Sequence, residues 1–161
     1  MKCLVTGGAG FIGSHIVDRL INDGHKVVVI DDLSTGNYDN LNEHVSDFHQ
    51  KDITKLRRQT DFSMFKGVDV VFHLAAFPRV EPSIQEPVYS HDINVNGMLN
   101  VLEACRLNGV KRFVFTSSSA VYGEAKTPTK EEHPTNPMSP YGLHKLIGAH
   151  YCKLFSELYG L

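Results

Sequence analysis

Short apolar runs alternate along this chain with longer segments in which apolar residues recur every three or four positions. The apolar runs cover residues 2–6, 26–30, 68–74 and 110–117, and a weaker run covers 47–50. Helical periodicity covers residues 11–22, 87–108 and 141–159, with a marginal helix at 54–65. Alternation of this kind builds a parallel sheet with helices on both faces. The pattern therefore predicts an α/β fold with a doubly wound parallel sheet, in one domain that covers residues 1–161.

Composition narrows the class of protein. With 161 residues, 42% of them apolar and 21% charged, the chain is long enough for one well-packed domain. The net charge of −2 disfavours a nucleic-acid binder, which usually presents a basic face. No apolar run approaches the roughly 20 residues of a membrane span, and Cys3, Cys105 and Cys152 lack metal-site spacing. We expect no nucleic acid, no membrane, no metal, and a cytoplasmic location with buried free thiols.

A glycine motif separates the first predicted strand from the first predicted helix. Gly7 suits a tight turn, Gly10 lets backbone N–H groups approach a pyrophosphate, and Gly13 lets helix and strand pack closely. A glycine-rich turn without a ligand is the alternative, but the position between strand and helix favours a dinucleotide site. The helix N-terminus adds positive potential for the phosphates.

An aspartate follows the second predicted strand. Asp31 lies where a carboxylate accepts both hydroxyl groups of an adenosine ribose and repels a 2′-phosphate. No arginine occurs between Asp31 and Asn42 to neutralise such a phosphate, so NAD is favoured over NADP. For Asp52 and Ile53, after the third strand, two interpretations remain open: a contact to the adenine, or simply the start of a helix.

Polar side chains near the end of the chain suggest proton transfer. Tyr141 and Lys145 are four residues apart on one predicted helix, so both side chains share a face. A nearby cation favours the phenolate form of tyrosine, which can act as a general base. The hydroxyl cluster 116–119 ends a buried strand, where ligands bind in open α/β sheets. Taken alone, that cluster is better explained by local bonds to the backbone.

Six segments together resemble the extended short-chain dehydrogenases/reductases, most closely the UDP-glucose 4-epimerase branch. They are TGGAGFIGS (6–14), DDLSTG (31–36), VFHLAA (71–76), NVNG (94–97), VKRFVFTSSSAVYG (110–123) and SPYGLHK (139–145). The resemblance implies a Rossmann-like fold with NAD as cofactor. Tyr141 would be the base and acid, Lys145 would support it and bond the nicotinamide ribose, and Ser118 would bond the reacting sugar hydroxyl. It places the cofactor against Gly7, Gly10, Phe11, Ile12, Gly13, Asp31, Asp32, Ser34, Thr35, Gly36, Asp52, Ile53, Leu74, Ala75, Ala76, Asn94, Thr116, Tyr141 and Lys145.

Neighbours of Ser118 point to the reaction. Related dehydratases carry Asp-Glu where this chain has Ser119 and Ala120, and related decarboxylases carry glutamate at the second position. Without that acid, the resemblance implies C4 epimerisation of a nucleotide sugar, UDP-glucose/UDP-galactose or the N-acetyl forms, through a transient 4-keto sugar. A lysine that some epimerases carry near Ala76 is replaced in this chain. The resemblance implies that segment 77–83 faces the substrate, so the sequence does not decide which sugar is accepted. Ile93 replaces a polar cofactor contact, which Asn94 could supply.

Members of this family are about twice as long, so the resemblance also implies that the C-terminal substrate region is absent here. The predicted helix at 141–159 has an apolar surface that is wider than one core contact needs. Two explanations remain open: a helix of the missing half covers the excess, or the chain forms a homodimer through the helices at 87–108 and 141–159, which is the arrangement that the resemblance implies. Two alternatives to the epimerase remain open. One is a non-catalytic dinucleotide-binding module, and the other is a dehydrogenase or reductase acting on a different alcohol.

Overall fold

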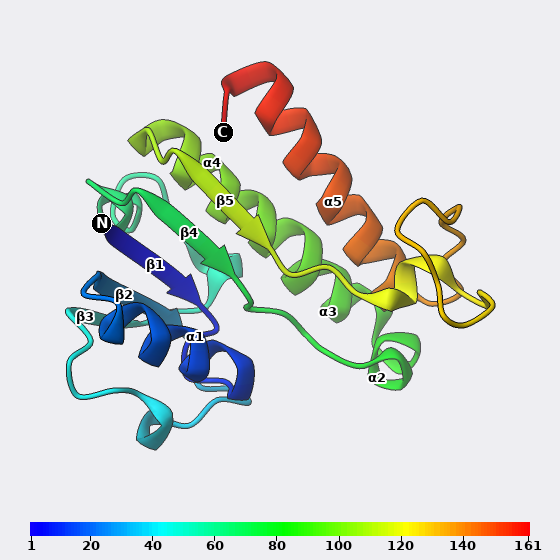
Figure 1. The fold of residues 1–161 in the computed structure, drawn as a ribbon, viewed down its shortest axis with the longest axis horizontal. Coiled ribbons are helices and arrows are strands. Elements are labelled where there is room, and N and C mark those ends of the chain that lie inside the picture. Colours follow the sequence, from blue (N-terminus) through cyan, green and yellow to red (C-terminus); the bar gives the residue numbers. More distant parts are fainter.

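Five parallel strands form the centre of the fold. The computed structural model describes all 161 residues (Figure 1). The strands are β1 (Lys2–Thr6), β2 (Lys26–Asp31), β3 (Asp47–Gln50), β4 (Val70–His73) and β5 (Arg112–Phe115). Their order in the sheet is β3-β2-β1-β4-β5, and every neighbouring pair is parallel. The chain winds outward from β1 in both directions, so the predicted doubly wound sheet is confirmed.

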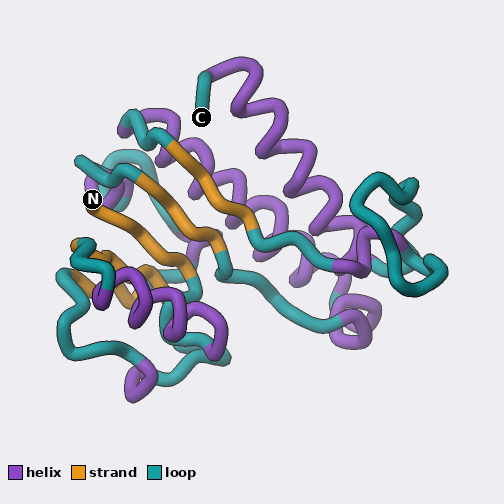
Figure 2. The backbone as a smooth tube through the Cα atoms, viewed as in Figure 1, coloured by secondary structure: helices purple, strands orange, loops and turns teal.

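Helices cover both faces of this sheet, as the ribbon and tube views show (Figures 1 and 2). The α-helices are α1 (Phe11–Asn22), α2 (Val80–Gln85), α3 (Pro87–His91), α4 (Met98–Asn108) and α5 (Pro140–Tyr159). Short 3-10 turns occur at η1 (Tyr38–Asn40), η2 (Ile53–Lys55), η3 (Phe62–Phe65) and η5 (Ser119–Tyr122). No helix combines the length and apolar character that crossing a membrane requires.

The core has two layers because successive strand residues face opposite sides of the sheet. Val5, Val27 and Val29 pack against Val17 of α1 on one side. On the other side, a larger cluster that includes Leu4 packs against Val101 of α4. The continuous apolar runs of the sequence are therefore explained by burial on both faces.

Two predicted helices differ from the structure. The predicted helix at 54–65 is wrong, because this segment contains only η2 and η3. Asp52 accepts the N–H of Thr54 and Asp61 accepts the N–H of Arg57, so local turns replace a helical ladder. The predicted helix at 87–108 forms, but a π-helical stretch, η4 (Asp92–Gly97), separates α3 from α4.

The catalytic helix of the prediction, α5, begins as expected. Ser139 is its N-cap and accepts the N–H of Gly142 at 3.1 Å, and Pro140 occupies the first turn. Further along, Gly148 leaves no room for a side chain, since a Cβ would lie 2.6 Å from the Phe115 ring and 2.8 Å from the Met98 sulfur. This close packing against β5 and α4 fixes the turn of α5 that carries Lys145.

Candidate active site

A cleft of about 500 Å³ opens along the carboxyl ends of β1, β2, β4 and β5. Ligands of open α/β sheets bind at this edge. Every residue predicted to touch the cofactor lines the cleft except Asn94. Six further residues complete the lining: Ile30, Lys51, Phe77, Pro78, Tyr89 and Ile93.

The glycine loop forms one end of the cleft. Gly7 has φ +72°, and a Cβ there would lie 2.7 Å from the backbone nitrogen of Ala75. A Cβ on Gly13 would overlap the carbonyl oxygen of Gly7. Gly10 is the N-cap of α1, has no side-chain cap, and would meet only the Gly7 carbonyl oxygen, at 3.3 Å. Two glycines thus permit tight packing and the third leaves the helix N-terminus open, which fits the pyrophosphate of a dinucleotide.

The Asp31 carboxylate ties this loop to β2. One oxygen accepts the N–H of Ala9 at 2.9 Å, and the other accepts the N–H of Leu33 at 2.9 Å. Asp31 is 8% exposed and lines the cleft. Carboxylate oxygens hold further lone pairs, so the group can still accept bonds from ribose hydroxyls.

Lys51, which the sequence analysis did not single out, is the cation that lines the cleft near Asp31. Its ammonium lies 3.1 Å from the Asp61 carboxylate. The N–H of Arg57, and then Lys51, hold the pKa of Asp61 below its usual range. Because Lys51 is already paired, it is poorly placed to neutralise a 2′-phosphate, which agrees with the preference for NAD.

Asp52 has a structural role in the cleft wall. One oxygen accepts the N–H and the hydroxyl of Thr54, both at 2.8 Å, so Asp52 caps the turn η2. Both Asp52 and Ile53 also line the cleft. The adenine contact considered for these residues stays a prediction beside this observed cap.

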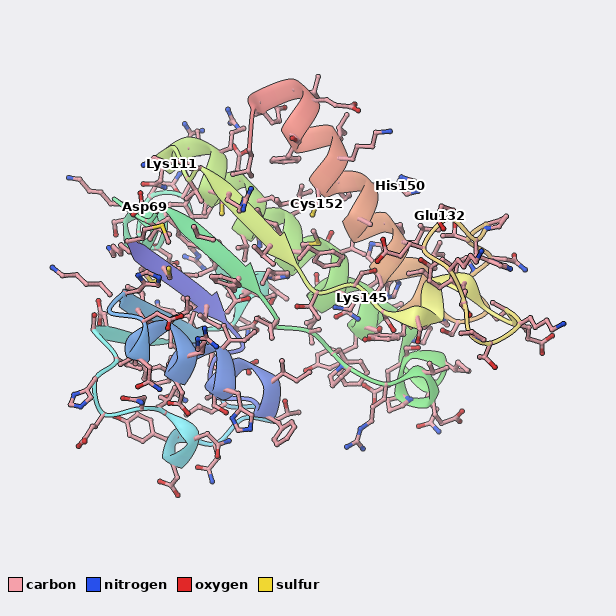
Figure 3. The ribbon with its side chains drawn as sticks, in the orientation of Figure 1. Asp69, Lys111, Glu132, Lys145, His150 and Cys152 are labelled. Atoms are coloured by element: carbon pink, nitrogen blue, oxygen red, sulfur yellow. The ribbon has the colours of Figure 1, made fainter.

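Tyr141 and Lys145 line the other end of the cleft. Lys145, labelled in Figure 3, extends from α5 beside the end of β5. The Lys145 nitrogen is 5.8 Å from the centre of the Tyr141 ring and donates to the carbonyl of Thr116 at 2.8 Å. Lys145 is 5% exposed, and burial lowers its pKa to about 8. A buried ammonium with one carbonyl partner has a strong tendency to attract an anion, such as a phenolate.

His73 lies beneath Lys145 as a neutral core residue. Its Nδ1 lies 2.8 Å from the hydroxyl of Thr6, and its ring stacks on Phe113 at 5.5 Å between ring centres. Burial, and then the charge of Lys145, lower the pKa of His73 to about 3. The ring therefore adds no second positive charge below the cleft.

Ser118 does not line the cleft. Its hydroxyl oxygen accepts the N–H of Ala120 at 3.2 Å and caps the turn η5, and the residue is half-buried. The local capping role weighed for the hydroxyl cluster is thus observed. Its catalytic role stays a prediction, since the hydroxyl hydrogen remains free to donate to a substrate.

Asn94 differs most from expectation, because its amide faces the loop after β4 and not the cleft. It accepts the N–H of Phe77 at 2.8 Å and donates to the Phe77 carbonyl at 3.1 Å. Ile93 lines the cleft instead. Asn94 is buried behind the wall and holds Phe77 in it.

Tyr89 was missed for a related reason: its ring packs edge-on against Phe77 at 5.1 Å, a contact that depends on how α3 folds back.

Histidines and cysteines elsewhere form no metal cluster: no three His, Cys, Asp or Glu side chains are placed to hold an ion. All three cysteines are free; Cys3 and Cys105 are buried, and Cys152 is half-buried. His144 is buried beside α3, with Nδ1 3.2 Å from the hydroxyl of Ser90.

Comparison with known proteins identifies the family. The profile of the NAD dependent epimerase/dehydratase family matches residues 3–161, so the chain belongs to this family. The resemblance inferred from the sequence motifs is confirmed, and so is NAD as the cofactor of the family.

Individual relatives agree with this assignment. A putative UDP-glucose 4-epimerase of Methanocaldococcus jannaschii is 48% identical over 98% of this chain and 52% of its own length. A UDP-N-acetylglucosamine 4-epimerase from Methanobrevibacter ruminantium, solved with UDP-N-acetylmuramic acid, superposes with a TM-score of 0.92 at 43% identity, over 99% of this chain and 52% of that one. The Thermus thermophilus UDP-glucose 4-epimerase, solved with NAD, superposes with a TM-score of 0.93 at 40% identity, over 100% of this chain and 52% of that one. The chain spans about half the length of these relatives.

Replacing the buried lysine should stabilise the protein. The pKa of Lys145 is about 8 in the folded state and 10.5 ordinarily. Below pH 8 the side chain is charged in both the folded and the unfolded states, and burying this charge lowers the free energy of unfolding. Lys145→Met should raise the free energy of unfolding at pH 7 by about 2 kcal/mol after the lost bond to Thr116 is counted. Chemical denaturation measures this difference.

The stability gained by Lys145→Met should depend on pH. Between pH 8 and pH 10.5 the unfolded wild type binds more protons than the folded one, so its stability rises with pH across that window. The advantage of Lys145→Met should therefore be full below pH 8 and fade towards pH 10.5. Lys153→Met, an exposed lysine on the same helix, should change stability little at any pH. A Lys145→Met variant that is less stable than wild type at pH 7 contradicts the conclusion that the buried charge of Lys145 lowers the stability of the protein.

Proposed function

We propose that this chain holds NAD and the proton-transfer residues of a nucleotide-sugar 4-epimerase, acting on UDP-glucose and UDP-galactose or their N-acetyl forms. One observation carries the proposal most directly. A single cleft joins the open glycine loop at one end to Tyr141 above the buried Lys145 at the other. The activities named for the relatives support the choice of sugar nucleotides.

The proposed mechanism follows from the surroundings of Tyr141. The Lys145 ammonium is buried and donates to one carbonyl oxygen, and it places its positive charge beside the Tyr141 ring, where it would favour proton removal by Tyr141. The phenolate takes the proton of the sugar C4 hydroxyl and later returns it, and Ser118 donates to that hydroxyl or its oxygen. NAD, which the glycine loop and Asp31 would hold in the cleft, would supply the hydride acceptor and donor for the reversible oxidation at C4, and the 4-keto sugar would turn over before the hydride returns to its opposite face.

The absence of an extra acid limits the reaction. Ser119 and Ala120 occupy the positions where related dehydratases carry Asp-Glu, so no carboxyl group there moves a proton at a neighbouring carbon. The reaction proposed is therefore a reversible redox change at one carbon with no net loss of atoms. Scattered free cysteines support a cytoplasmic location for it.

The proposed base can be tested by removing one oxygen. In the full-length protein that contains these residues, Tyr141→Phe should lower kcat for interconversion of UDP-glucose and UDP-galactose by roughly 100- to 10,000-fold, with the NAD content unchanged. Tyr151→Phe, on the same helix and outside the cleft, serves as the matched control and should keep wild-type turnover.

Two outcomes would sink the proposal in different ways. A loss of less than tenfold in Tyr141→Phe removes Tyr141 as the base. Net formation of reduced NAD with an oxidised sugar product, measured by absorbance, assigns the chain to a dehydrogenase instead.

We also propose a homodimer in which α5 and the helical segment 87–108 (α3, η4 and α4) pack on a second copy. Exposed apolar side chains gather on this helix, with Leu143 47% exposed, Leu154 44% and Leu158 62%. A second copy would remove them from water. Light scattering of the 161-residue chain should give about twice its mass of 18.0 kDa. A mass of 18.0 kDa at all concentrations tested excludes the dimer for this chain.

A further inference from the structure

The turn after β4 holds an arginine in a backbone conformation that normally requires glycine. Arg79 has φ 86° and ψ 141°, and only Leu33 among the other non-glycine residues has a positive φ. Glycine adopts this region at no steric cost, whereas any side chain strains it. Arginine at such a position is explained most simply by a use for the side chain itself.

Contacts on both sides of Arg79 pin the turn. On one side, the Asn94 amide holds both the N–H and the carbonyl of Phe77. On the other side, the Ser83 hydroxyl donates to the Val80 carbonyl at 2.6 Å. Asn94 is 5% exposed and Ser83 is fully buried, so both anchors are part of the rigid interior. A strained residue persists only where its surroundings fix it in this way.

The same anchors place the turn beside the proposed base. The Ser83 hydroxyl accepts the backbone N–H of Tyr141 at 3.1 Å, which satisfies one free donor at the start of α5. Phe77 and Pro78, directly before Arg79, line the cleft. Arg79 itself does not line the cleft, but it directly follows Pro78, which does, and the turn that carries it is tied to the start of α5 at Tyr141.

The Arg79 side chain has no competing partner. It is exposed, and none of the eight ion pairs in the structure includes it. The guanidinium group stays charged and presents paired N–H donors that match a carboxylate or a phosphate.

We propose that Arg79 binds an anionic group of the substrate at the rim of the cleft, and that the pinned turn presents it for that purpose. The inference rests on the proposed function, because it takes the substrate to be a nucleotide sugar. Two groups on such a molecule have the required chemistry: the diphosphate, and a carboxylate carried by the sugar.

The first test is thermal unfolding of Arg79→Gly. Glycine relieves the strain, so the melting temperature should rise by roughly 3 °C. The same substitution at Arg58, exposed and without a positive φ, is the matched control and should leave the melting temperature unchanged or lower it. A fall in the melting temperature of Arg79→Gly contradicts the strained turn.

The second test is calorimetric titration of the NAD-loaded, full-length protein with UDP-glucose and with UDP-glucuronate. If Arg79 binds the diphosphate, Arg79→Gly should lower the affinity for both ligands by roughly tenfold or more. If Arg79 binds a sugar carboxylate, only the affinity for UDP-glucuronate should fall. Arg79→Lys should keep part of the affinity, and Arg58→Gly should keep all of it.

Unchanged affinity of Arg79→Gly for both ligands overturns the proposal, and so does wild-type protein that binds neither. Because the readout is binding, it is independent of turnover. A protein that binds these ligands through Arg79 but does not interconvert UDP-glucose and UDP-galactose would contradict the epimerase and leave the role of Arg79 supported.

Discussion

The contact of the glycine loop with two strand ends is the constraint on which the cleft depends. Gly7 lies so close to the backbone of Ala75 that no side chain fits, and Gly13 approaches the Gly7 carbonyl even more closely. The Asp31 carboxylate then fastens the loop to β2 through the N–H of Ala9. These contacts join β1, β2, β4 and α1 at one point. They leave the N-terminus of α1 open to an anion, without a side-chain cap.

The opposite end of the cleft obeys a different constraint. There the chain buries an ammonium group with a single carbonyl acceptor, which costs stability in the absence of a ligand. Close packing of Gly148 on β5 and α4 holds the helix that carries this group, and Ser83 holds its first turn. The fold thus supports an unfavourable charge and a strained arginine near the same end of one cleft. Unfavourable features of this kind concentrate at functional sites, where surrounding contacts maintain them.

Local signals explain which parts of the structure could be predicted. Each strand is an apolar run covered on both faces, and α5 begins at a serine and a proline that suit its first turn. The glycine motif is likewise contained in a short stretch of sequence, and Asp31 directly follows an apolar run. Their positions around the cleft followed from the general rule that ligands bind at the carboxyl ends of parallel strands.

Features that depend on distant contacts could not be predicted. The amide of Asn94 faces Phe77, seventeen residues away, and Lys51 pairs with Asp61 across a turn. The helix α2 contains Pro82 in its first turn, which hides it from helical patterns although proline is tolerated there. The strain at Arg79 appears only when both anchors of the turn are known. These features depend on contacts that form only in the folded structure, so neighbouring residues in the sequence do not indicate them.

The central claim is that this cleft holds NAD and rejects the 2′-phosphate of NADP. Calorimetric titration of the 161-residue chain with both dinucleotides tests it most directly. The account predicts saturable binding of NAD and binding of NADP at least tenfold weaker, because Asp31, which lines the cleft, is predicted to accept the ribose hydroxyls, and because Lys51 is held by Asp61. NADP binding as tightly as NAD, or no binding of either dinucleotide, would contradict it.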